Sequence, residues 1–180
     1  MDQSSAVWIL IALSLITASL PFVVERPFVA LPWTQAGEPD RSLAWRWIES
    51  LVFFALLVAL AYFALQLIGG AFFTGSDMGS VGLFLAKVGG VIAIAALMLA
   101  YPGWRNKGQA VKKAFIDRLL EVMVFYALVG TLGFAFEANI GNVFTQNWEF
   151  YAITFSLFLV LAYPGFVYRY LMRHPKPKNG

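Results

Sequence analysis

The chain has 180 residues, of which 60% are hydrophobic and only 13% are charged, and its mean hydropathy is +0.72. A soluble domain of this length has too little interior to bury that much apolar surface, so the composition excludes a soluble globular protein. The sequence contains no cysteine, which excludes disulfides, iron–sulfur clusters and thiolate chemistry.

Five apolar segments are long enough to cross the hydrocarbon core of a bilayer, which takes roughly 20 helical residues. They lie at residues 6–24, 50–72, 81–101, 119–138 and 148–168. The first segment has no basic residues before it and no small-residue cleavage site after it, so we expect a retained helix rather than a signal peptide. The sequence therefore predicts an all-α, polytopic membrane protein with five transmembrane helices.

Lys and Arg lie almost entirely on alternate connections between these segments. They follow the first, third and fifth segments, whereas the connections after the second and fourth contain neither residue. Because basic loops remain in the cytoplasm, this pattern predicts an N-terminus outside and a C-terminus inside the bacterial inner membrane. The pI of about 9.3 follows from this topology and gives no reason to expect nucleic acid, although phospholipids are expected against the basic loops.

Part of the chain is repeated. Residues 46–56 and 118–128 are identical at six of eleven positions, and Leu-Ala-Tyr-Pro-Gly occurs at both 99–103 and 161–165. The repeated unit is a helical hairpin that starts on the same side in each copy, so helices 2–3 and 4–5 are expected to form parallel tandem repeats. The expected organisation is a first transmembrane helix with its cytoplasmic loop (1–42), hairpin repeat 1 (43–116), hairpin repeat 2 (117–172) and a disordered basic tail (173–180).

The repeated Pro-Gly pairs are expected to shape the ends of two helices. Pro102-Gly103 should end the third helix, because proline cannot continue a helix and glycine accepts a left-handed cap. After Pro164-Gly165 the sequence still has a helical pattern, so we expect a kink followed by an amphipathic extension.

Two Arg-x-x-Glu pairs, Arg46/Glu49 and Arg118/Glu121, occupy the first turns of the second and fourth helices. The helix dipole favours a carboxylate there, and we expect the arginine three residues earlier to neutralise it locally. The expected role is to anchor the helix ends at the membrane interface, and the alternative is a proton or ligand site on the cytoplasmic side.

Lys87 lies several residues inside the third apolar segment, where a lipid-facing ammonium costs on the order of 2–3 kcal/mol at full depth. Alignment of the repeats puts Glu149 at the equivalent position of the second copy, and Glu137 lies in the same leaflet. We expect Lys87 to pair with Glu137 or Glu149. The alternative is a lone lysine that snorkels to the interface.

Small residues follow one face of the third helix. Gly82, Ala86 and Gly90 recur at four-residue steps, a spacing that lets two helix backbones approach closely. We expect this face to pack either within the chain or against a partner helix.

The sequence contains no motif that indicates catalysis. Its single histidine, His174, lies in the tail, so the membrane segments contain no bis-histidine haem site. It has no phosphate-binding glycine loop, no dinucleotide fingerprint and no nucleophile with a recognisable base. We therefore expect no catalytic residues, no cofactor and no metal site, and a protein that is not an enzyme.

Five segments of the second repeat carry a family resemblance. They read RLLE (118–121), GFAFEA (133–138), GNVF (141–144), NWEFYAIT (147–154) and PGFVYRYL (164–171). With the first helix, they resemble a family of small uncharacterised proteobacterial inner-membrane proteins that are encoded beside the operon for NADH:quinone oxidoreductase, respiratory complex I. Members typically have three helices of about 20 residues, so the extra hairpin here is interpreted as a tandem duplication.

This resemblance implies a non-catalytic accessory or assembly subunit that binds the membrane arm of complex I through apolar helices. Its implied partners are membrane-arm subunits and phospholipids, and the family has no catalytic residues to carry over. The alternative is a small membrane carrier, or a quinone- or lipid-handling protein built from parallel hairpins. An antiporter is disfavoured, because Lys87 and the glutamates lie near helix ends rather than at mid-membrane.

Overall fold

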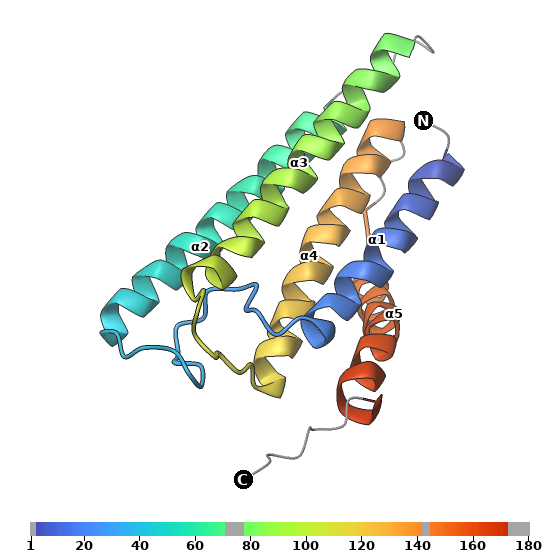
Figure 1. The fold of residues 1–180 in the computed structure, drawn as a ribbon. Helices are drawn as coiled ribbons and strands as arrows, with labels where there is room; N and C mark the ends of the chain where they lie inside the picture. Colours follow the sequence, from blue (N-terminus) through green and yellow to red (C-terminus); the bar gives the residue numbers. More distant parts are fainter. Residues whose placement is uncertain (1–2, 71–77, 142–144, 173–180) are drawn as a thin grey trace.

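The computed structural model describes residues 3–70, 78–141 and 145–172 and is almost entirely helical (Figure 1). The helices are α1 (Gln3–Val23), α2 (Leu43–Ala64), α3 (Met78–Arg105), α4 (Phe115–Ile140) and α5 (Trp148–Val167), and two π-helical turns, η1 (Leu65–Gly69) and η2 (Tyr168–Met172), continue α2 and α5. All five helices are long and apolar enough to span a membrane, so the predicted all-α class and the predicted number of such helices are confirmed. The predicted tail (173–180), with His174, lies outside the described residues.

Two helices begin earlier than their apolar residues alone predict. α2 begins at Leu43 because the Ser42 hydroxyl caps it, accepting a hydrogen bond from the amide of Trp45 at 3.4 Å. α4 begins at Phe115, where the Asp117 carboxylate accepts the backbone N–H of Ala114 at 2.9 Å. The polar first turns of both helices are therefore helical, and they carry charged side chains into the bundle.

The expected end of the third helix at Pro102-Gly103 is wrong, because α3 continues through both residues to Arg105. A proline this near the C-terminus of a helix removes only one backbone hydrogen bond. Gly103 is needed for packing instead, since a Cβ there would lie only 3.2 Å from the Cβ of Arg26.

The second Pro-Gly also marks a close contact. A Cβ at Gly165 would lie 2.7 Å from the carbonyl oxygen of Ser19, so α5 and α1 cross with their backbones nearly touching. The Ser19 hydroxyl donates a hydrogen bond to the carbonyl of Leu161 at 3.3 Å across the same crossing. Beyond Pro164 the chain stays helical through η2, which is the predicted extension.

The five helices form two groups (Figure 1). α1 packs against α4 and α5, whereas the α2–α3 hairpin meets this group largely where η1 packs on α4. The amide nitrogen of Asn139 on α4 donates to the carbonyl of Ile68 in η1 at 3.0 Å, which fixes this crossing. One buried apolar cluster joins the groups here, and a second lies toward the end where α2 and α4 begin.

The connection between α1 and α2, residues 24–42, folds back across the end of the bundle, and we call it the strap. Its Val29 and Ala30 are buried in the second cluster. The amide of Lys112 donates to the carbonyl of Ala36 at 2.8 Å, which joins the strap to the α3–α4 connection. The strap is therefore part of the packed structure rather than a free loop.

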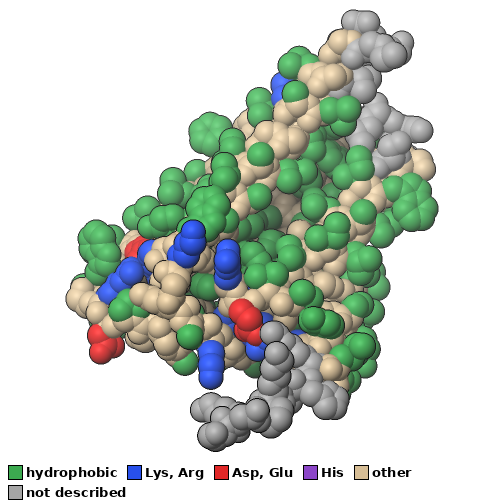
Figure 2. Space-filling view, viewed as in Figure 1, with side chains coloured by type: hydrophobic (Ala, Val, Ile, Leu, Met, Phe, Trp, Pro, Cys, Tyr) green, Lys and Arg blue, Asp and Glu red, His purple; other side chains and the backbone are tan. Residues whose placement is uncertain are grey.

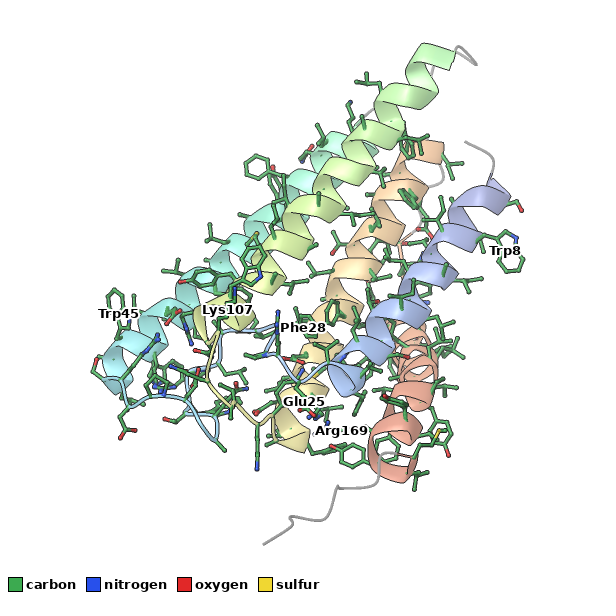
Figure 3. The ribbon with its side chains drawn as sticks, viewed as in Figure 1. Trp8, Glu25, Phe28, Trp45, Lys107 and Arg169 are labelled. Carbon is green, nitrogen blue, oxygen red and sulfur yellow. The ribbon has the colours of Figure 1, made fainter. Side chains whose placement is uncertain are left out.

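Exposed tryptophans lie near both ends of the helices. Trp8 and Trp148 lie near the N-termini of α1 and α5, and Trp45, Trp47 and Trp104 lie near the helix ends at the strap. Figure 3 shows Trp8 and Trp45 toward opposite ends of the bundle. The surface between them is largely apolar (Figure 2). Tryptophan is enriched at the two membrane–water interfaces, so this arrangement is typical of a bundle that spans a bilayer.

Candidate functional site

Charged side chains gather at the strap end of the bundle (Figure 2). Within the described part of the chain, every ion pair lies there. The pairs form one group around α4 and a second group around α2 and α3, and the strap contributes a carboxylate to each. This network is the most polar buried region of the molecule.

The α4 group is centred on Glu121, whose side chain is only 1% exposed. One carboxylate oxygen accepts a hydrogen bond from Nζ of Lys113 at 2.7 Å, and the other accepts the backbone N–H of Phe28 at 2.8 Å. Nζ of Lys113 also lies 4.9 Å from the centre of the Phe28 ring, a cation–π contact. These contacts replace the water that both charges lose on burial.

Arg118 extends the α4 group toward α1 and α5. Its guanidinium donates to the carbonyl oxygen of Pro21 at 2.7 Å and to the Glu25 carboxylate at 3.0 Å. Glu25 also pairs with Arg169 of η2, and Figure 3 shows these two residues close together at the strap end. The arrangement ties the ends of three helices to the first residues of the strap.

Asp117 fixes the middle of the strap. One of its carboxylate oxygens accepts the indole N–H of Trp33 at 3.0 Å, and the other accepts the side-chain amide of Gln35 at 3.1 Å. Because Asp117 also caps α4, one buried carboxylate sets both the start of the helix and the path of the strap.

The second group is centred on Glu38 of the strap. Its carboxylate accepts hydrogen bonds from Arg46 at 2.7 Å, from Arg105 at 3.0 Å and from the side-chain amide of Asn106 at 2.9 Å. Arg105 also pairs with Glu49, so the strap, α2 and α3 are joined through one set of charges.

Burial and pairing lower the pKa values of two groups, which favours the charged form of Glu38 but disfavours that of Lys113. Burial raises the pKa of Glu38, but hydrogen bonds from Arg46 and Asn106 outweigh it and hold that pKa below its usual range. Burial lowers the pKa of the Lys113 ammonium, and the attraction of Glu121 only partly offsets this. Glu38 is therefore firmly ionised at neutral pH, whereas Lys113 depends on Glu121 to keep its charge.

The expected pairing within each Arg-x-x-Glu motif is not formed. In both copies the arginine bonds to a strap carboxylate, and the glutamate bonds to a basic residue at the end of α3 or in the α3–α4 connection. An ion pair between neighbours on one helix surface stabilises the helix by only about 0.2–0.5 kcal/mol. The pairs that also satisfy buried charges on other segments therefore form instead. The observed pairs are Arg46–Glu38, Arg118–Glu25, Glu49–Arg105 and Glu121–Lys113.

The expected pairing of Lys87 with Glu137 or Glu149 is also not formed. Lys87 is half-buried on α3, whose backbone lies against α2 and η1. α3 meets α4 through apolar side chains, such as Phe84, whose ring centre lies 5.9 Å from that of Phe136. Glu137 is half-buried on α4, and Glu149 is exposed in the first turn of α5. Among the described residues, Lys87 therefore has no carboxylate partner.

The small-residue face of α3 is exposed. Gly82, Ala86 and Gly90 all face outward, and a Cβ at either glycine would meet nothing within 4 Å. Among the described residues, the alternative of packing within the chain is therefore not observed, and this face has room for a neighbouring helix.

Two hollows lie beside the strap. An apolar cavity of about 320 Å³ lies between α1, α2, α3 and α4 and includes Phe28 at its strap end. A basic hollow of about 610 Å³ lies beyond the strap and is lined by residues that include Arg26, Lys107 and Lys112. Among the described residues, no group of His, Asp or Glu side chains is arranged to hold a metal ion.

Sequence reasoning missed most of the buried network. It did not single out Glu25, Glu38, Lys113, Asp117 or Arg105, although all five lie in the basic connections used to assign topology. A signal was present, because the strap contains carboxylates inside an otherwise basic loop. Acidic residues in a basic loop indicate internal ion pairs.

The fold and the charged strap end define a multi-pass α-helical membrane protein. The chain belongs to a family described as "Protein of unknown function (DUF2818)", whose model matches residues 6–104 and again 94–173. The first match covers α1 and most of the first hairpin, and the second covers the end of α3 with α4 and α5, in agreement with an internal duplication. Comparisons with curated proteins and with solved structures found no match.

Proposed function

We propose that the chain is a non-catalytic accessory or assembly subunit that docks on the membrane arm of respiratory complex I in the bacterial inner membrane. The choice of complex I rests on the family resemblance described above. The strap end would face the cytoplasm, because it carries the basic connections, and the N-terminus would then lie outside. The two hairpins would be parallel repeats, since α2 and α4 both begin at the strap end.

The observation that carries the proposal is the exposed face of α3. Its Gly82, Ala86 and Gly90 leave room for a second helix backbone, and none of the described residues fills that room. Lys87 flanks the same face without a carboxylate partner among the described residues. Because an unpaired lysine at membrane depth is costly, a carboxylate or carbonyl on a neighbouring subunit would stabilise it.

The buried ion pairs support a structural role for the strap end. Glu38 joins the strap to α2 and α3, and Glu25 joins it to α4 and η2. Because Asp117 of α4 also holds the middle of the strap, the strap fixes the α2–α3 hairpin relative to α4. A fixed hairpin presents its outer face to a partner without the entropic cost of ordering it on binding.

The docking proposal is tested by co-purification with matched variants. Ala86→Leu adds bulk to the exposed face of α3, and Ala152→Leu makes the same change at an exposed position of α5. Tagged protein is extracted in a mild detergent, and complex I subunits are quantified by mass spectrometry. Wild type and Ala152→Leu should retain them, while Ala86→Leu should retain about tenfold less, as for an overpacked interface.

Two outcomes would contradict this proposal. Folded wild-type protein that brings down no complex I subunit would exclude docking on that complex. Equal retention by the two leucine variants would exclude the α3 face as the contact.

A second candidate function, quinone or lipid handling, is favoured by the apolar cavity. A hydrocarbon chain is the ligand that suits walls made almost entirely of aliphatic and aromatic side chains. Organic extraction of the purified protein followed by chromatography would show whether a quinone copurifies at a fixed ratio.

A further inference from the structure

We infer that the chain binds one anionic phospholipid, with the lipid phosphate among Arg26, Lys107 and Lys112 and one acyl chain in the apolar cavity. The inference does not depend on docking to complex I. It rests on three features of the strap end: an apolar cavity, a set of unpaired cations, and their adjacency.

The cavity has the character of a hydrocarbon site. Its volume of about 320 Å³ falls in the range of ligand pockets, about 300–1,000 Å³. Its polar lining is limited to the hydroxyls of Thr17 and Thr131, and both already donate to carbonyls of their own helices. Water would find few partners there, so an apolar chain is the favoured occupant in a membrane.

The cations at the basic hollow are available to a ligand. Arg26, Lys107 and Lys112 are exposed and form no ion pair with any described residue. The other charged groups of the hollow are already matched: Lys113 pairs with Glu121, and Glu25 pairs with Arg118 and Arg169. The hollow therefore has three positive charges without counterparts within the described part of the chain.

The two hollows are adjacent along two chain segments. Pro27 lines the basic hollow, and its neighbour Phe28 lines the cavity. On α3, Gly103 lines the basic hollow, and Ala100, about one turn earlier, lines the cavity. A phospholipid with its head at the membrane surface has its phosphate and first methylenes in this same order.

The positive charge of the hollow determines which lipid headgroup it favours. Each Lys or Arg near a membrane surface strengthens binding to anionic lipid by about fivefold, and a zwitterionic headgroup gains little of this. A free phosphate would use the cations but not the cavity, and a quinone would use the cavity but not the cations. An anionic phospholipid uses both.

The test is native mass spectrometry of the full chain in mild detergent, titrated with dioleoylphosphatidylglycerol or dioleoylphosphatidylcholine. The two lipids have the same acyl chains, so any difference comes from the headgroup. Lys107→Gln should weaken phosphatidylglycerol binding about fivefold, whereas Lys87→Gln, the same change at the other end of α3, should not. The triple change of Arg26, Lys107 and Lys112 to Gln should weaken binding on the order of a hundredfold.

The cavity is tested by a second matched pair. Ala95→Leu fills part of the cavity and should weaken binding of both lipids about tenfold, whereas Ala93→Leu, on the exposed side of α3, should not. Circular dichroism establishes that each variant is folded. If Ala95→Leu fails to fold, the Gln variants at the exposed cations still test whether the lipid binds there.

Three results would overturn the inference. Equal affinity of the wild-type protein for the two lipids would show that the three cations do not select the headgroup. Displacement of phosphatidylglycerol by millimolar inorganic phosphate, with no effect of Ala95→Leu, would show a site for free anions. Binding of a short-chain quinone, with no binding of phosphatidylglycerol, would assign the cavity to quinone.

Discussion

Removal of the charge of Glu121 should destabilise the protein in a pH-dependent way. In Glu121→Gln the side chain keeps its volume and an oxygen that accepts the backbone N–H of Phe28. The substitution removes only the negative charge that faces Lys113, whose side chain is 0% exposed. Lys113 must then either stay charged without a partner or lose its proton.

The cost of losing that proton sets the size of the effect. The ordinary pKa of the lysine is 10.5, and each pH unit below it costs about 1.36 kcal/mol for neutralisation. At about pH 7.5 this gives about 4 kcal/mol, within the range of about 3–5 kcal/mol for breaking a buried ion pair. At about pH 9.5 the same reasoning gives only about 1.4 kcal/mol.

The sign follows from proton binding. In the variant, burial lowers the pKa of Lys113 in the folded state, so the unfolded chain binds more protons between that pKa and 10.5. Stability of the variant must therefore rise with pH through this window. Other charges near Lys113 come from Arg118 and Asp117, and they are unchanged by the substitution.

Reversible unfolding in mixed micelles, followed by circular dichroism at the two pH values, measures the effect. The double variant Lys113→Met with Glu121→Gln has no buried charge at this position and should regain most of the lost stability. The reasoning would be refuted if Glu121→Gln lost the same stability at both pH values. A double variant as unstable as the single one would refute it equally.

Two further predictions concern packing and acid stability. Gly165→Ala places a Cβ 2.7 Å from the Ser19 carbonyl oxygen and should lower the unfolding free energy by about 1–3 kcal/mol. Gly130→Ala, whose Cβ meets nothing within 4 Å, should not lower it. Thermal unfolding of both variants measures the difference, and equal unfolding midpoints would contradict the close crossing of α1 and α5. The lowered pKa of Glu38 means that its contribution is full above its ordinary value of 4.5 and is lost as the pH falls through the folded pKa. Glu38→Gln should therefore be less stable than wild type by about 2 kcal/mol at neutral pH and nearly equal to it in acid, and unchanged stability at neutral pH would contradict the role of this carboxylate.

The number of helices and their approximate places were predictable from the sequence. Apolar length and composition dominate in a membrane chain, because each span must satisfy its own backbone hydrogen bonds. The boundaries were less predictable, since Ser42 and Asp117 extend α2 and α4 into polar sequence through capping. Pro102 shows the same limit, because a proline in the last turn of a helix does not end it.

The ion-pair network was not predictable from local patterns. Glu25 and Arg118 are 93 residues apart, and Glu38 and Arg105 are 67 residues apart. Local spacing favours Arg46 with Glu49, but only the path of the strap determines which carboxylates approach these arginines. The charged end itself was predictable, because the positive-inside pattern already gathers these residues on one side.

The prediction for Lys87 failed for a related reason. Alignment of the repeats treats the two hairpins as equivalent, yet α5 packs on α1 whereas α3, its counterpart, lies against α2 and η1. Lys87 and Glu149 therefore occupy matching positions in sequence but different surroundings in space. The pairing of the α3 face with a neighbour stays a prediction.

Docking on complex I is tested most directly by the composition of the native complex. Complex I is purified through a tag on one of its own subunits, from membranes of the organism that encodes this chain, and both are quantified against isotope-labelled peptides. We expect about one copy of the chain per complex, in the fractions that hold the intact membrane arm. A ratio near zero in the intact complex, while the folded chain is abundant in the same membranes, would contradict the proposed function.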